Sequence, residues 1–324
     1  MTNSTTGLIY GFYLNGDNKG SPCRWEDIES GLPSTPVWLH FDYTDKQAQH
    51  WLQQRSEIEP LVADALLSEE TRPRTSLING ELLVALRGVN LSPGQDPDDM
   101  VSIRIWSDGK HVISTRRRRL LSAQDLAFSI AAGTGPDSAG ALICELTANL
   151  ISRMQQTLGN IDETVDGLEE RLLLSIAGLQ RGEVAGIRQQ VISIRRYLSP
   201  QREAMLQLQS EKILWIDNNN RLRLRETTDV LTRYIEDLDS IRDRAAVIHE
   251  EINNRLAERM NNRMYVLSIV AAIFLPLGFF TGLLGINVGG IPGSENPYAF
   301  MVFCVFLTTI VGIQAWLFKK KGWF

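Results

Sequence analysis

The sequence predicts a membrane protein of the α+β/α class, with an N-terminal cytoplasmic α/β domain, a long helical stalk and two C-terminal transmembrane helices. Three observations support this prediction. Short β-rich runs dominate the first 135 residues, a helical repeat follows, and the chain beyond residue 264 is mostly apolar. With 324 residues, the chain is long enough for one globular domain and a separate helical region.

The first 135 residues are predicted to form a compact domain with a mainly antiparallel sheet. Asn79-Gly80 and Asp108-Gly109 are typical of β-hairpin turns. Helical patterns are expected at 45–55 and 57–68. The β-rich runs lie at 8–14, 37–42, 76–78, 81–89, 101–106 and 111–115.

Several classes of protein are excluded by what the sequence lacks. It contains no P-loop, no G-x-G-x-x-G after a strand and no G-x-S-x-G, so neither an enzyme nor a bound cofactor is expected. The net charge of −5 argues against a nucleic-acid partner. Cys23, Cys144 and Cys304 form no C-x-x-C pair, so we expect neither a disulfide framework nor a thiolate zinc site.

A long helix is predicted to connect the soluble part to the membrane. No proline or glycine interrupts 227–275, and two shorter helical segments precede it at 139–180 and 183–214, with a kink or a short break expected at Leu198-Ser199-Pro200. Because the apolar positions alternate in steps of three and four, the long helix carries a heptad seam that must pack on neighbours. The seam positions are Leu231, Tyr234, Leu238, Ile241, Ala245, Ile248 and Ile252.

Two stretches are predicted to cross a membrane, 264–284 and 299–318, since neither contains Asp, Glu, Lys or Arg. A helix of about 20 residues spans the roughly 30 Å hydrocarbon layer. By the positive-inside rule, both termini are expected in the cytoplasm and the connecting loop outside. The basic residues behind this orientation are Arg255, Arg259 and Arg263 before the first span and Lys319, Lys320 and Lys321 after the second.

Pro276 lies inside the first span. Proline has no N–H, so the carbonyl of Ala272 loses its helical partner and the helix tends to kink. In lipid, such a carbonyl must find another donor or face water. Two interpretations stay open: the kink serves helix packing alone, or it shapes a pore.

At the outer end of the first span the chain reads Gly285-Ile286-Asn287, followed by a glycine-rich loop. A Gly-x-Asn between two C-terminal spans, with lysines at the chain end, resembles the CorA superfamily of divalent-cation transporters, in which the central residue is typically Met. Ile286 and the glycine-rich loop make the chain similar to the ZntB branch, which is associated with zinc. The alternative is that Gly285 only caps a helix and Asn287 satisfies loop backbone groups.

The resemblance implies a funnel-shaped homopentamer in the bacterial inner membrane, with the first spans around a central path. Five Asn287 amides would present neutral oxygens to a hydrated divalent cation at the outer mouth, and Gly285 and Ile286 would complete the selectivity motif. Projecting the family's pore face onto this sequence gives Gly278, Leu275, Leu267 and Met264 in the membrane and Glu250 in the stalk.

Two alternatives concern these predicted pore residues. Leu267 and Leu275 could pack helix on helix instead of facing the axis. His249 is a candidate for a transient zinc contact, because zinc favours nitrogen ligands, but it could also be a solvated stalk histidine.

The leading hypothesis is therefore transport of zinc or another divalent metal cation into the cytoplasm, with proton coupling as an option. A magnesium or broad-specificity channel of the CorA type is the first alternative, and a membrane-anchored coiled-coil scaffold or sensor is the second. The expected partners are further copies of the chain, the lipid bilayer and divalent metal ions. The expected parts are the α/β domain (1–135), the helical hairpin and stalk (136–263), the first span (264–285), the outer loop (286–298), the second span (299–318) and a cytoplasmic tail (319–324).

Overall fold

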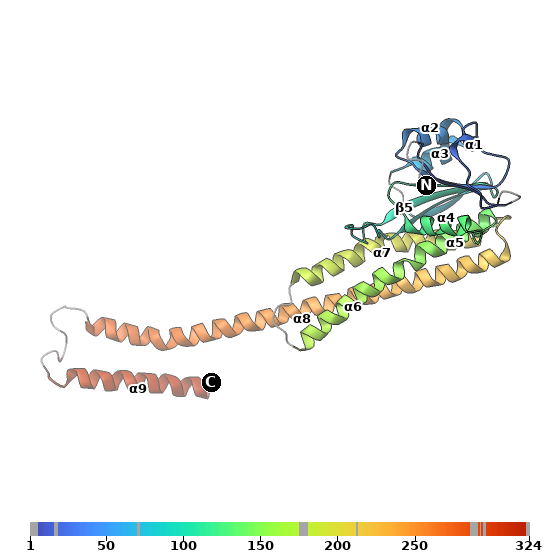
Figure 1. The fold of residues 1–324 in the computed structure, drawn as a ribbon. Helices are drawn as coiled ribbons and strands as arrows, with labels where there is room; N and C mark the ends of the chain where they lie inside the picture. Colours follow the sequence, from blue (N-terminus) through green and yellow to red (C-terminus); the bar gives the residue numbers. More distant parts are fainter. Residues whose placement is uncertain are drawn as a thin grey trace. The chain divides into compact units, whose positions relative to one another are not determined.

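The computed structural model describes residues 6–15, 19–69, 72–174, 181–211, 213–285, 291, 293 and 296–321. The chain divides into two compact units, Met1–His249 and Glu250–Phe324. Helix α8 (Asn218–Gly285) begins in the first unit and ends in the second. Figure 1 labels the helices and strand β5.

The first unit contains a six-stranded sheet in the order β1-β2-β6-β5-β4-β3. Neighbouring strands are antiparallel except for β2 and β6, which are parallel. The predicted antiparallel component is confirmed, and each predicted β-rich run corresponds to one strand. The strands are β1 (Leu8–Tyr13), β2 (Val37–Asp42), β3 (Arg74–Ile78), β4 (Glu81–Gly88), β5 (Val101–Ser107) and β6 (Val112–Arg116).

Helices cover both faces of this sheet, with α1, α2 and α3 on one side and α4, α5 and α7 on the other (Figure 1). Side chains alternate along β2: Phe41 packs with Trp51 of α2 in the core beneath α1–α3, whereas His40 points to the opposite face. Because both faces are covered, five of the six β2 residues are buried. These helices are α1 (Trp25–Ile28), α2 (Lys46–Gln54), α3 (Pro60–Leu67), α4 (Leu121–Ala131), α5 (Ala139–Ser152) and α7 (Arg181–Ser210).

His40 is a fully buried imidazole within the sheet. Its Nδ1 lies 2.7 Å from Ser114 Oγ, and its ring stacks on Tyr10. Its Nε2 has no hydrogen-bond partner in the described part of the chain. Burial, and secondarily the positive charge of Arg116, hold the pKa of His40 well below its usual value.

The buried His40 predicts a loss of stability in mild acid. Below about pH 6.5 the unfolded chain takes up a proton that folded His40 does not, so the free energy of unfolding should fall by up to about 1.4 kcal/mol per pH unit. Thermal unfolding of the full-length protein in detergent, followed from about pH 7.5 to 5.5, measures this slope. His40→Gln should flatten it, whereas His50→Gln, at an exposed position, should not. An equal slope in the two variants would contradict the prediction.

The stalk segments differ in two details from the sequence expectation. The predicted helix over 139–180 is divided at Arg153, whose guanidinium Nε donates to Asp125 of α4 at 2.8 Å, into α5 and α6 (Met154–Leu173). Residues 175–180 lie outside the described part. Helix α7 continues through Pro200, so the short break that was one of the two expectations there does not occur, and the kink stays a prediction.

Contacts with the sheet hold α7 on the C-terminal side of Pro200. The Gln201 side-chain oxygen accepts the backbone N–H of Arg87 in β4 at 2.6 Å. The Ala204 carbonyl accepts the hydroxyl of Thr75 in β3 at 2.7 Å. We attribute the continuity of α7 to this anchoring, which fixes the turn that follows the proline.

The heptad seam of α8 is confirmed in the structure. Leu231, Leu238 and Ala245 have no exposed surface, and the other predicted positions are also buried apart from Tyr234. At that turn Ile235 is buried instead. The seam therefore follows the predicted spacing with a local shift of one residue.

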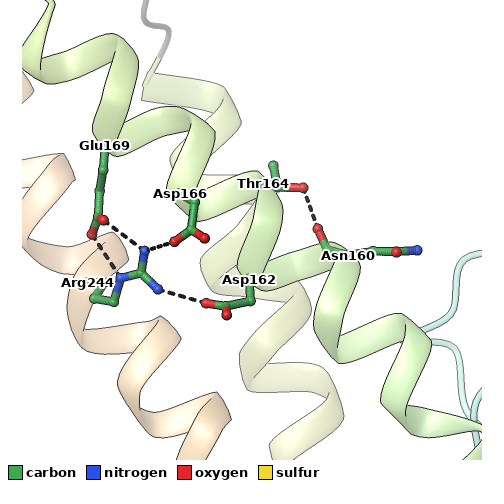
Figure 2. Close-up of polar contacts among 6 residues, drawn as sticks. All are labelled: Asn160, Asp162, Thr164, Asp166, Glu169 and Arg244. Atoms are coloured by element: carbon green, nitrogen blue, oxygen red, sulfur yellow. Dashed lines mark hydrogen bonds and ion pairs between the residues drawn. The ribbon is translucent and has the colours of Figure 1, made fainter.

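A charge cluster joins α6 to α8 in the first unit (Figure 2). Asp162, Asp166 and Glu169 lie on one face of α6, and all three carboxylates contact the guanidinium of Arg244 on α8. The Nε and Nη2 of Arg244 donate to the two oxygens of Glu169 at 2.9 and 2.8 Å, and Nη1 donates to Asp162 at 2.7 Å. These hydrogen bonds raise the pKa of Arg244 and lower that of Glu169.

Candidate functional site

Two helices of the described chain are long and apolar enough to cross a membrane, α8 and α9 (Ala299–Lys320). Within the second unit they contact each other, and two of the contacts show how they are paired. The rings of Phe280 and Phe306 meet edge to face with centroids 5.1 Å apart. Gln314 Nε2 donates to the carbonyl oxygen of Ala272 at 3.2 Å. The pairing of these positions makes the two helices antiparallel, as a membrane hairpin requires.

One face of the α8 span packs against α9. The side chains on this face are less exposed than those of neighbouring residues in α8. They recur every three or four residues, as positions on one face of a helix do. The face includes both contact residues, Ala272 and Phe280. The partly buried positions are Ile269, Ala272, Ile273, Pro276, Leu277 and Phe280.

The four predicted pore residues of the span lie on the opposite face. At about 100° per residue, their mean direction is roughly half a turn from the face that contacts α9. All four are accessible to solvent in the single chain. The exposed fraction is 61% for Met264, 68% for Leu267 and 72% for Leu275, and a Cβ added at Gly278 would have no neighbouring atom within 4 Å. The structure thus groups these residues on one surface that α9 leaves uncovered.

The predicted selectivity motif is described only in part. Gly285 is the last residue of α8; it is exposed, and a Cβ added there would have no neighbouring atom within 4 Å. Ile286 and Asn287 lie outside the described residues. The helix end thus places the start of the motif at the end of the span, as the sequence predicts.

The stalk candidates form no metal cluster. His249 is partly buried, and its Nδ1 is enclosed without a hydrogen-bond partner in the described part of the chain. Glu250 is exposed. Among the residues that the structure describes, no group of three or more His, Cys, Asp or Glu is placed to hold a metal ion.

The basic residues at the ends of the spans are exposed or partly exposed. Arg259 and Arg263 on α8 are exposed, and so are Lys320 and Lys321 at the end of α9. Lys320 Nζ lies 5.3 Å from the ring centre of Trp316, an arrangement that suits a membrane interface.

One polar contact of the membrane part was not predicted. Sequence reasoning identified the carbonyl that Pro276 releases, but it did not identify Gln314 as its donor. The signal was present, because Gln314 is the single amide side chain in a span whose residues are mostly apolar.

The chain matches the model of a known protein family. A family model described as "CorA-like Mg2+ transporter protein" matches residues 33–320. The chain belongs to this CorA-like family. Membership confirms the resemblance given by the Gly285-Ile286-Asn287 motif and the two C-terminal spans.

Relatives within the CorA-like family match nearly the whole chain. A "Divalent cation transporter CmaX" of Pseudomonas aeruginosa is 39% identical, covering 98% of this chain and 97% of the relative. A "Zinc transport protein ZntB" of Pectobacterium carotovorum is 35% identical, covering 98% and 96%.

Solved structures support the same fold. The structure of full-length CmaX matches with a TM-score of 0.82 at 37% identity and covers 99% of both chains. The CorA magnesium transporter of Methanocaldococcus jannaschii matches with a TM-score of 0.75 at 16% identity, covering 89% of this chain and 92% of the other. The predicted α+β/α class with a long helix and two C-terminal apolar helices is thereby confirmed.

Proposed function

We propose that this protein transports divalent metal cations across the bacterial inner membrane, with zinc as the leading cargo and no enzymatic activity. The observation that supports this proposal most directly is the exposed face of α8. This face contains all four predicted pore residues of the span and ends at Gly285. The names of the relatives, a divalent cation transporter and a zinc transport protein, support the same cargo class.

The exposed face suits contact with further copies of the chain. It carries small residues beside the predicted pore positions, and small residues allow transmembrane helices to approach closely. We propose a funnel-shaped homopentamer in which five α8 helices surround an aqueous axis. The small residues on this face are Ser268, Ala271, Gly278, Gly282 and Gly285.

A path of this kind would handle a metal ion through its water shell. The predicted lining of Met264, Leu267 and Leu275 contains no charge, so it cannot replace the hydration of a divalent cation, and such apolar rings can gate by dewetting. At the outer mouth, Asn287 would offer a neutral amide oxygen to the hydrated ion. Glu295 in the outer loop and His249 and Glu250 in the stalk are the titratable groups that we propose for proton coupling.

The exposed basic residues at the span ends support a cytoplasmic location for both termini. With this orientation, the membrane potential contributes about 4.6 kcal/mol per 100 mV to the entry of a divalent ion. We propose the same division as the sequence suggests: cytoplasmic parts at 1–135 and 136–263, spans at 264–285 and 299–318, an outer loop at 286–298 and a short inner tail at 319–324.

Flux into proteoliposomes loaded with a zinc-sensitive dye tests the proposal. The wild-type protein should give a zinc signal, and Asn287→Ala should reduce it at least about tenfold by removing the oxygen ring, as expected for the loss of about 1.4 kcal/mol at the barrier. Asn262→Ala, at an exposed position of α8, is the matched control and should leave flux unchanged. Equal flux in the two variants would contradict the role of Asn287.

Competition experiments separate the alternatives. A magnesium or broad-specificity channel predicts that magnesium competes with zinc and that a pH gradient has no effect. A coiled-coil scaffold or sensor predicts no ion flux at all. Native mass spectrometry of the detergent-solubilised protein measures the copy number, and a monomer would contradict the pore.

A further inference from the structure

The carbonyl of Ala272 is the backbone acceptor that Pro276 leaves without its regular helical donor. In the structure α8 is continuous through Pro276, and Gln314 of α9 supplies a donor: its Nε2 lies 3.2 Å from Ala272 O. An unpaired carbonyl in hydrocarbon is costly, and the donation from the second span removes this cost.

The chemistry of the contact fixes how the Gln314 amide is oriented. A backbone carbonyl only accepts, so the NH₂ group of the amide must face Ala272 and the oxygen must face away. That oxygen, Oε1, is enclosed and has no hydrogen-bond partner among the described residues. A leucine of similar size would fill the same space without donating.

The contact at Ala272 lies within about two helical turns of two predicted pore residues of α8. Pro276 is flanked by Leu275 and Gly278, both on the exposed face opposite α9. The edge-to-face pair of Phe280 and Phe306 holds the two helices together farther along the span. With its carbonyl bonded to α9, the turn at Ala272 is tied to the second span by the Gln314 contact.

We propose that Gln314 is a positioning residue for transport: it replaces the helical hydrogen bond missing at Pro276 and so holds the helical turn from Ala272 to Pro276, which keeps Leu275 and Gly278 on the path. This inference rests on the proposed function. Gln314 itself lies on the helix behind the path and does not contact the ion. Its loss should therefore lower the maximal flux and leave unchanged the zinc concentration that gives half-maximal flux.

A double-mutant cycle tests the proposal. Gln314→Leu should reduce maximal zinc flux per folded oligomer about fivefold to tenfold, in line with the strength of interhelical hydrogen bonds in membranes. Pro276→Ala restores an N–H for the Ala272 carbonyl, so adding Gln314→Leu to it should change flux less than about twofold. Thr309→Val is the matched control, because its hydroxyl donates at 2.8 Å to Val305 O within α9 and not to α8.

The thermal midpoint in detergent gives a second readout that does not depend on flux. Gln314→Leu should lower the midpoint in the wild-type background but not in Pro276→Ala. Additive effects of the two substitutions, a control variant as impaired as Gln314→Leu, or a changed half-maximal zinc concentration would each overturn the inference. Absence of flux in the wild-type protein would instead overturn the proposed function, so the two failures are distinguishable.

Discussion

Exchanging Arg244 for glutamate is expected to release α6 from α8 in the first unit. The guanidinium is the shared counter-charge of Asp162, Asp166 and Glu169, and the new carboxylate would face all three. These side chains are partly solvated, between 29% and 62% exposed, so Arg244→Ala alone should cost only about 1–2 kcal/mol for the whole network. Arg244→Glu should cost more, because it adds repulsion.

Hydrogen exchange measured by mass spectrometry over α6 is the suitable measurement, since it reports local opening. Exchange of the α6 amides should become at least about tenfold faster in Arg244→Glu than in the wild-type protein. Added salt should reduce this difference in exchange rate, because it screens the repulsion between the carboxylates. Arg242→Ala is the control, because the ion pairs of Arg242 in the described part of the chain are with Asp239 and Asp243 of its own helix. Equal acceleration in Arg242→Ala would show that the interhelical cluster does not hold α6.

Adding a methyl group at Gly11 is expected to detach the segment that covers the edge strand β1. A Cβ at this position would lie 2.1 Å from the carbonyl oxygen of Cys23, which is a backbone atom and cannot turn aside. The same segment is bonded to β1, with Cys23 N–H donating to Gly11 O at 2.8 Å and Tyr13 N–H donating to Ser21 O at 3.1 Å. Gly11→Ala should therefore cost about 2–3 kcal/mol, as overpacking of a tight site does.

Chemical unfolding of the full-length protein gives the measurement for Gly11→Ala. Gly159→Ala is the control: Gly159 lies within α6 with open space at its Cβ position, so alanine should be neutral or stabilise the helix by up to about 1 kcal/mol. If Gly11→Ala were as stable as Gly159→Ala, the segment at Ser21–Cys23 would be able to move away from β1 without lowering the free energy of unfolding, and the prediction would be wrong.

Local patterns were sufficient to predict much of the fold. The turn pair Asn79-Gly80 has positive φ at both residues and joins β3 to β4, as its sequence indicates. The heptad seam predicted α8, because apolar residues in steps of three and four lie on one face of a helix and that face is the one that packs. Helix α4 was not predicted, since its N-cap position is Leu120, which offers no side-chain acceptor to mark the start.

Features that depend on distant parts of the chain could not be predicted in this way. The parallel pairing of β2 with β6 joins strands that are far apart in sequence, and nothing in either strand specifies the partner. Arg244 and its three carboxylates are likewise brought together only by the packing of α6 on α8.

For the candidate site, the family's pore face pointed to Leu275 and Gly278, and both lie on one exposed surface of α8. It could not identify the donor that pairs with Ala272, because the donor lies on another helix. That Leu275 and Gly278 line the ion path stays a prediction.

The parallel pair of β2 and β6 also has a consequence for biogenesis. On the ribosome, β2 cannot complete its second ladder until β6 has been made, so the sheet closes late relative to its first strand. Helices α5, α6 and α7 are made before the apolar end of α8, and α7 covers β3 and β4. The soluble unit can thus bury its sheet before any membrane-seeking segment leaves the exit tunnel, which separates folding in water from insertion into lipid.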